Sequence, residues 1–151
     1  MKKFRFPLEK LLEYRDHVEQ NEMVALGRIH ARRRELLSKL QDVRDLRVHY
    51  ETDRKHKCEI GAKNSELILI DGYLEQLRQR SEQLQMALFQ CDREVERQTA
   101  ILLEATKNKN ALEKLEDQYA TAYRREELKE NETFIEEFVG NVHSINPPGI
   151  G

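Results

Sequence analysis

The feature of this sequence that most constrains its fold is an alternation of four- and three-residue steps between apolar positions, which begins at Ile70. Seventeen positions follow this spacing as far as Glu126, and twelve of them are apolar. An average step of about 3.5 residues keeps one narrow stripe facing a partner helix, as in a left-handed coiled coil. We call this stripe the seam. Its positions are Ile70, Leu74, Leu77, Ser81, Leu84, Leu88, Cys91, Val95, Gln98, Leu102, Ala105, Lys109, Leu112, Glu116, Tyr119, Tyr123 and Glu126.

The composition indicates that each helix buries only a stripe. Charged residues make up 36% of the 151 residues, and the chain has no Trp, 6 Gly and 3 Pro. This is too polar for a compact core of that length, yet too periodic for a disordered chain. We therefore predict an all-α protein, a long antiparallel two-helix coiled coil.

The first helix is predicted to open near Pro7, because proline suits the first helical position. From Leu8 to Lys55 it would extend about 70 Å at 1.5 Å per residue. Its apolar stripe is broader than that of the second helix, with an additional column at Leu12, Leu26 and Leu40. The stripe comprises Leu8, Leu11, Leu12, Val18, Ala25, Leu26, Ile29, Leu36, Leu40, Val43, Leu46 and Tyr50.

The periodicity fails between Lys55 and Ser65, so the hairpin turn is predicted near residues 56–65. Gly61 can end a helix in the left-handed conformation, and Asn64 or Ser65 can cap the next helix. Asp71-Gly72 is a second, weaker breaker. The second helix is predicted to run to about Val139, some 15 residues beyond the first. Residues 1–139 would form a single hairpin and residues 140–151 a flexible tail.

Charge supports pairing between the two halves of the chain. Residues 1–57 carry a net charge of +5 and residues 58–151 a net charge of −7. A hairpin centred near residue 62 would place Leu36 opposite Leu88, and the arginines 32–34 opposite Asp92, Glu94 and Glu96. Opposite charges that flank a seam favour the intended partner helix.

The sequence offers no catalytic constellation, so we do not expect an enzyme. The five histidines form no i, i+4 pair, and His56 with Cys58 is too sparse for a zinc site. We expect no metal, no cofactor and no small-molecule substrate. The arginines near residue 32 can contact nucleic acid, but the acidic stretch predicted to face them argues against a nucleic-acid partner. No apolar run is long enough to cross a membrane.

One candidate binding patch lies near the turn. Tyr50 and Tyr73 are predicted to lie abreast, and the patch comprises Val43, Leu46, Tyr50, Tyr73 and Leu77. The apolar area of this group is larger than a two-helix seam can bury, so part of it should be exposed. Exposed aromatic patches often mark partner sites. Ordinary core packing at a splayed tip is the competing interpretation.

Three segments resemble the FliJ family of the flagellar type III export apparatus. They are the opening FRFPLEKLLEYR, the middle GAKNSELILIDGYLEQL and the stretch KNKNALEKLEDQYATAYRREELKENE. The likeness extends from about residue 4 to residue 139. The ending VGNVHSINPPGIG has no counterpart in it.

The resemblance implies a stalk-like, non-enzymatic protein of the cytoplasm, peripherally associated with the inner face of the cell membrane at the flagellar base. The implied partners are the hexameric flagellar export ATPase, the cytoplasmic domain of the membrane export gate, and export chaperones. We assign the gate to the patch near the turn and expect a monomeric hairpin. We assign the ATPase to the open end of the hairpin: Phe4, Phe6, Leu8, Leu11, Leu12, Leu112, Leu115, Tyr119 and Tyr123.

Two other classes remain open at this stage. A stalk protein of a virulence type III secretion system would share the architecture and differ in its partners. A generic coiled-coil scaffold or tether would share the architecture and have no ATPase partner.

Overall fold

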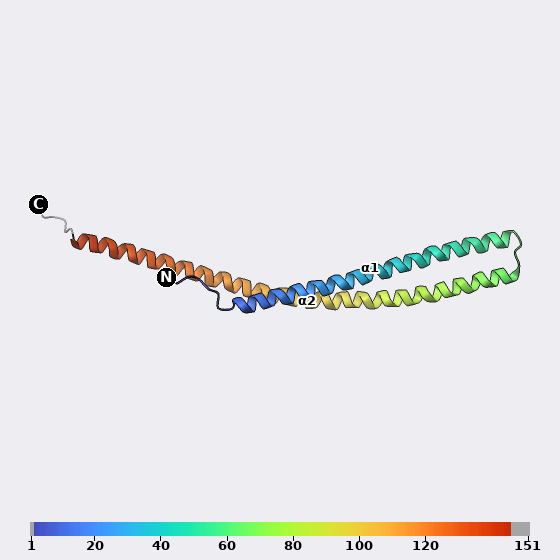
Figure 1. The fold of residues 1–151 in the computed structure, drawn as a ribbon, viewed down its shortest axis with the longest axis horizontal. Coiled ribbons are helices and arrows are strands. Elements are labelled where there is room, and N and C mark those ends of the chain that lie inside the picture. Colours follow the sequence, from blue (N-terminus) through green and yellow to red (C-terminus); the bar gives the residue numbers. More distant parts are fainter. Residues whose placement is uncertain (1, 146–151) are drawn as a thin grey trace. The chain divides into compact units, whose positions relative to one another are not determined.

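The protein is an all-α helical hairpin, as predicted. The structure, a computed structural model, describes residues 2–145, with side chains described as far as Val142. Helix α1 spans Glu9–Glu59 and helix α2 spans Asn64–Ile145, and the described residues include no strand (Figure 1). Within the described part of the chain, no helix is apolar over a length that would span a bilayer.

The turn between the helices follows the predicted chemistry. Gly61 has φ 75°, in the left-handed region that glycine enters without steric cost. The Ala62 amide donates to the Lys57 carbonyl at 2.9 Å, and the Gly61 amide donates to the Cys58 carbonyl at 3.3 Å. This pair of bonds is the Schellman arrangement, which satisfies carbonyls left free at the end of α1.

Two helix boundaries differ from the prediction. Asp71-Gly72 does not interrupt α2, which is continuous from Asn64. The helix also continues through Gly140 to Ile145, beyond the expected end at Val139. Residues 146–151 of the predicted tail lie outside the described residues.

The chain divides into two units, which we describe separately. The hairpin unit, Gln20–Leu103, contains the turn and the antiparallel stretches of α1 and α2 that run side by side in Figure 1. Its buried apolar residues are Leu40, Ile70, Leu84 and Cys91. Every predicted seam position from Ile70 to Leu102 is buried or half-buried. The 3.5-residue spacing therefore identified the buried face of α2 correctly.

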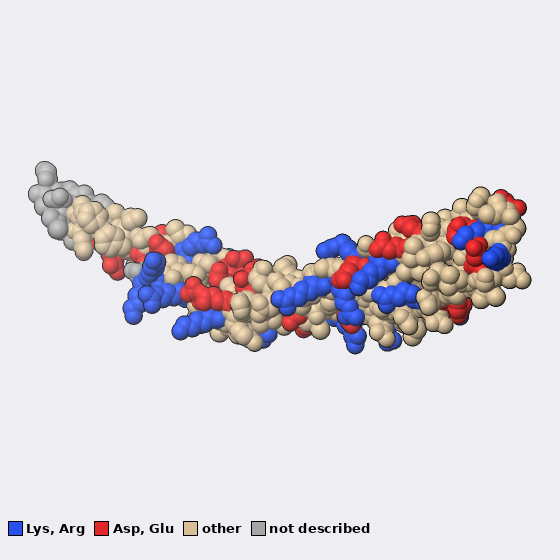
Figure 2. Space-filling model, turned by 45° about the vertical axis from the view of Figure 1, so that its right-hand side comes forward, with Lys and Arg blue, Asp and Glu red and all other residues tan. Residues whose placement is uncertain are grey.

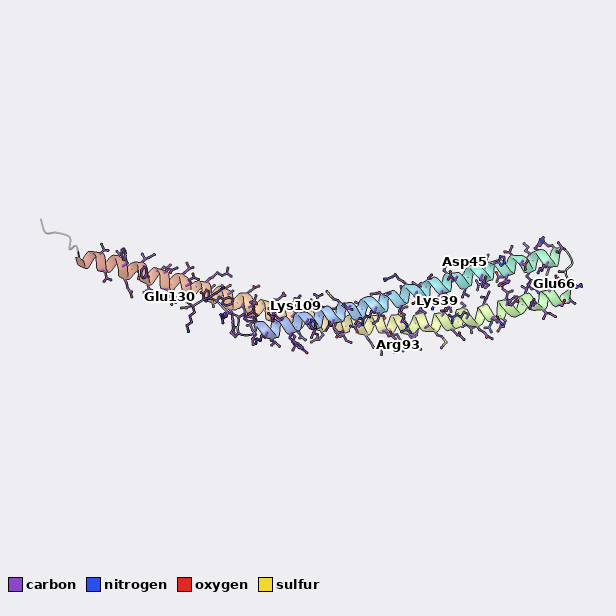
Figure 3. All side chains as sticks on the ribbon, in the orientation of Figure 1. Lys39, Asp45, Glu66, Arg93, Lys109 and Glu130 are labelled. Atoms are coloured by element: carbon purple, nitrogen blue, oxygen red, sulfur yellow. The ribbon has the colours of Figure 1, made fainter. Side chains whose placement is uncertain are left out.

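The terminal unit combines residues 1–19 with residues 104–151. Here the start of α1 packs on α2, and Ala105 is buried between them. Residues 2–6 are not helical and lie against the next part of α2, where Phe4 and Phe6 contact Tyr123 and Tyr119. Beyond Tyr123, every side chain described from residue 124 to residue 142 is exposed. Figure 3 labels Glu130 on this part of α2.

The buried face of α1 is narrower and more polar than its apolar residues suggest. Leu11 and Leu46, which the sequence placed in the stripe, are exposed. Arg15, Glu22 and Arg33 are half-buried, and Glu19 is buried. These polar residues complete the same four-three spacing: Leu8, Leu12, Arg15, Glu19, Glu22, Leu26, Ile29, Arg33, Leu36, Leu40 and Val43.

Candidate contact surfaces

Two cross-helix ion pairs join the helices of the hairpin unit. Arg33 Nε lies 2.6 Å from Asp92 Oδ1, and the hydrogen bond that joins them raises the pKa of Arg33. Arg32 lies 3.5 Å from Glu94. These are two of the contacts predicted between the arginines and the acidic stretch. On the face drawn in Figure 2, basic and acidic side chains intermingle over much of the described surface.

Polar side chains also meet inside the seam of this unit. The Gln98 amide donates to the Glu22 carboxylate and, at 3.2 Å, to the Glu22 carbonyl. The Cys91 thiol is buried and donates to the Ile29 carbonyl at 3.6 Å. Each polar group finds its partner only when the two helices are aligned in this register, so the pairs add specificity to the apolar contacts.

The terminal unit contains a buried charged pair. Lys109 Nζ lies 2.8 Å from Glu19 Oε1 and 3.4 Å from Asp16 Oδ1. The hydrogen bond from Lys109 lowers the pKa of Glu19, and the same bond raises the pKa of Lys109. Glu19 is only 4% exposed. Sequence reasoning missed this residue, although a lysine at a seam position indicates that an acid lies opposite.

The predicted patch near the turn is assembled in the hairpin unit. Tyr50 and Tyr73 stack with ring centroids 5.3 Å apart. Tyr73 is 40% exposed and Leu46 is also exposed, whereas Val43, Tyr50 and Leu77 are half-buried. The patch therefore combines packing inside the hairpin with apolar surface that remains open.

A groove of about 210 Å³ lies against this patch and shares Val43 and Leu77 with it. Arginines from both helices line the groove: Arg44, Arg47 and Arg78. The Arg78 guanidinium lies 2.5 Å from Glu75 Oε1 and 2.6 Å from Glu82 Oε1. The hydrogen bond to Glu75 and the charges of both glutamates raise the pKa of Arg78. Glu82 also lines the groove, and Arg47 lies 3.7 Å from Glu51, so the lining combines apolar side chains with charges of both signs.

The aromatic residues predicted for the open end come together in the terminal unit. Phe6 meets Tyr119 edge to face with ring centroids 5.6 Å apart, and Phe4 lies 5.4 Å from Tyr123. The Tyr123 hydroxyl donates to the Lys2 carbonyl at 2.5 Å. Phe6 is buried, so part of the predicted surface is internal packing. Leu11 and Tyr119 keep exposed area, and Leu8, Leu12, Leu112 and Leu115 are half-buried.

A third surface was not predicted from the sequence. It is a stripe of exposed apolar side chains on the part of α2 beyond Tyr123, and we call it the distal stripe. The sequence does contain a signal for this surface, because the apolar residues Leu128, Ile135 and Val142 are spaced seven residues apart. The distal stripe comprises Leu128, Phe134, Ile135, Phe138, Val139 and Val142.

The described residues offer contact surfaces and no metal cluster. Between residues 2 and 142 no group of three or more His, Cys, Asp or Glu side chains is placed to hold a metal ion. The cysteines are separate, with Cys58 exposed and Cys91 buried.

Comparison with known proteins gives the family. The family model of the flagellar FliJ protein matches residues 4–144. A search of curated proteins finds no significant match. Among solved structures, the chain is similar to a YscO homolog from Chlamydia trachomatis, at 15% identity and a TM-score of 0.48, over 95% of this chain and 97% of that one. Since the family model covers both helices and the turn, the chain belongs to the FliJ family of flagellar proteins.

Proposed function

We propose that this protein is a non-enzymatic, stalk-like component of the flagellar export apparatus, which binds the hexameric export ATPase and the membrane export gate. The observation that carries the proposal is the family match over residues 4–144, which includes both helices and the turn. The protein would act in the cytoplasm at the inner face of the membrane and assist the delivery of export substrates and chaperones. It would contribute binding surface, since both units leave aromatic and aliphatic side chains such as Tyr119 and Tyr73 exposed.

We assign the ATPase contact to the terminal unit. The aromatic pairs Phe4–Tyr123 and Phe6–Tyr119 hold the non-helical start of the chain against α2. They leave Tyr119 and Leu11 partly open to solvent. Exposed aromatic and aliphatic side chains supported by buried neighbours are typical of energetically important interface residues.

A matched pair of substitutions tests the ATPase contact. Leu11 in the terminal unit and Leu37 in the hairpin unit are each 39% exposed. We expect Leu11→Asp to weaken association with the ATPase and its stimulation, while Leu37→Asp leaves both unchanged and the two variants melt at similar temperatures. Equal loss in both variants, or no loss in Leu11→Asp, would remove this assignment.

We assign the export gate to the patch near the turn and its groove. The stacked Tyr50–Tyr73 pair presents a rigid apolar surface beside arginine side chains. Tyrosine suits such a site because it buries a large area for little loss of rotamer freedom. The open area of Tyr73 and Leu46 supports binding over core packing alone.

Tyr73→Ala tests the gate contact, with Tyr14→Ala as its control. Tyr14 is a more exposed tyrosine in the terminal unit. We expect Tyr73→Ala to reduce binding of the isolated cytoplasmic gate domain, with only a small change in melting temperature. The control variant should bind normally. A strongly destabilised Tyr73→Ala protein that still binds the gate would show that the patch is core.

A further inference from the structure

The distal stripe has the spacing of a coiled-coil seam and lies on the part of α2 beyond Tyr123. Leu128, Asn131, Ile135, Phe138 and Val142 alternate three- and four-residue steps, the spacing of a and d positions in a heptad repeat. All five side chains are exposed. The same spacing marks the buried face of α2 between Ile70 and Leu102, whereas the side chains of the distal stripe are exposed.

The distal stripe does not continue the seam that pairs α2 with the rest of the chain. Continuing the four-three steps from Tyr123 gives Glu126, Glu130, Thr133 and Glu137, all polar. Leu128 and Ile135 lie two positions after Glu126 and Thr133, about 200° around the helix at 3.6 residues per turn. A longer α1 in the same register would therefore leave the distal stripe uncovered. A helix that covered the stripe would therefore have to come from elsewhere than the register of α1.

The charge around the distal stripe indicates what that partner carries. Residues 126–142 contain six glutamates and one lysine, a net charge of −5. In the heptad defined by Leu128 and Ile135, Glu127 and Glu132 occupy the positions that flank the seam. Flanking residues pair across a coiled coil with the flanking residues of the partner helix. Lysine or arginine at those partner positions would be favoured.

The same charges argue against two other occupants. In a parallel pair of identical distal helices, Glu127 of one copy would face Glu132 of the other, and like charges at facing positions destabilise such a pair. An anionic membrane surface would repel a helix with this net charge, since surface helices that bind such membranes are rich in Lys and Arg.

We propose that the distal stripe is the docking site for a basic amphipathic helix of another protein. The apolar face of that helix packs on Ile135, Phe138 and the side chains around them. Its flanking Lys or Arg side chains pair with Glu127 and Glu132. Phe134 and Val139 widen the apolar face in the second heptad, so the tightest packing lies there. This inference does not depend on the contacts assigned to the ATPase or the gate.

The test uses the full chain and a defined probe, a synthetic amphipathic helical peptide with a leucine face flanked by lysines. Binding is measured by fluorescence anisotropy. The variant is Phe134→Ala with Ile135→Ala and Phe138→Ala, because alanine keeps the helix while removing the stripe. The control is Met86→Ala with Phe89→Ala, which removes exposed apolar side chains of the hairpin unit. A second peptide replaces the lysines by glutamates.

We expect the lysine peptide to bind the wild-type chain, and to bind less tightly as salt is raised. The triple variant should lose at least about tenfold in affinity, as expected when side chains at the centre of an interface are truncated. The control should bind as the wild type does. Equal binding to the triple variant, or equal binding of the glutamate peptide, would overturn the proposal.

Two further measurements separate the other occupants. Self-association in sedimentation that disappears in the triple variant would assign the stripe to a second copy of the chain, and the proposal would fail. If the wild type bound anionic vesicles and the triple variant did not, the distal stripe would be a lipid-binding surface, and the proposal would also fail. We expect neither. Because the triple variant keeps Leu11 and Tyr73, its ATPase and gate binding report separately on the proposed function.

Discussion

The hairpin unit and the part of α2 beyond Tyr123 carry the same kind of pattern with opposite outcomes. In the hairpin unit, Ile70, Leu84 and Cys91 are buried against α1. Beyond Tyr123, Leu128, Ile135 and Val142 follow the same spacing and are exposed. Both stretches are helical. The comparison shows that a heptad pattern predicts a helix and its apolar face. Whether that face is buried depends on the presence of a partner helix.

The largest expected effect is the difference in stability lost when a buried seam side chain and an exposed distal side chain are each truncated to alanine. Leu84→Ala should destabilise the hairpin by about 2–5 kcal/mol, because it removes buried methyl groups and leaves a cavity. Phe138→Ala should change stability by no more than about 0.5 kcal/mol, because the ring contacts solvent. Urea unfolding followed by circular dichroism measures both. A similar loss in the two variants would mean that the distal stripe is covered in the free protein.

The buried charged pair sharpens the comparison within the terminal unit. Glu19→Ala should lower the melting temperature clearly, because it leaves Lys109 in the seam without its nearest carboxylate. Glu132→Ala on the exposed part of α2 should leave the melting temperature almost unchanged. Replacing Glu19 and Lys109 together by leucine should recover part of the loss. If the melting temperature of the double variant were lower than that of Glu19→Ala, the charged pair would stabilise the folded protein more than a contact between two leucines does.

The same pair predicts an acid dependence of stability. The folded-state pKa of Glu19 is lowered from its ordinary value near 4.5. The ionised Glu19 carboxylate therefore stabilises the folded protein fully at pH values above 4.5. The contribution is lost as the pH falls through the lowered folded-state pKa. Melting temperatures of the wild type and Glu19→Gln should therefore converge below about pH 4.5 and differ by a constant amount near neutrality. A gap that widened in acid would contradict the assignment.

The smallest expected effect concerns the surface ion pairs of the hairpin unit. Arg32 and Glu94 lie 3.5 Å apart with much of each side chain exposed. A double-mutant cycle with Arg32→Ala and Glu94→Ala should give a coupling of no more than about 1 kcal/mol, reduced further by salt. A larger coupling would show that ion pairs, and not the apolar seam, hold the two helices together.

Much of the candidate surface near the turn could be predicted, because it depends on register. The turn at Gly61 and the apolar positions around Ile70 place Tyr50 beside Tyr73, as the stacked rings confirm. The open end was predicted only in outline. The sequence does not reveal that the non-helical start of the chain lies on α2 and buries Phe6, since no local pattern specifies that contact.

The sequence by itself determined the two helices, the turn and the buried face of α2, because these follow from local propensity and a spacing of about 3.5 residues. Only the tertiary structure decided which positions of α1 complete the seam. Glu19 and Arg33 are buried or half-buried because Lys109 and Asp92 lie across from them. It also decided that the distal stripe is left open, since the burial of a polar or apolar side chain depends on what the opposite helix provides.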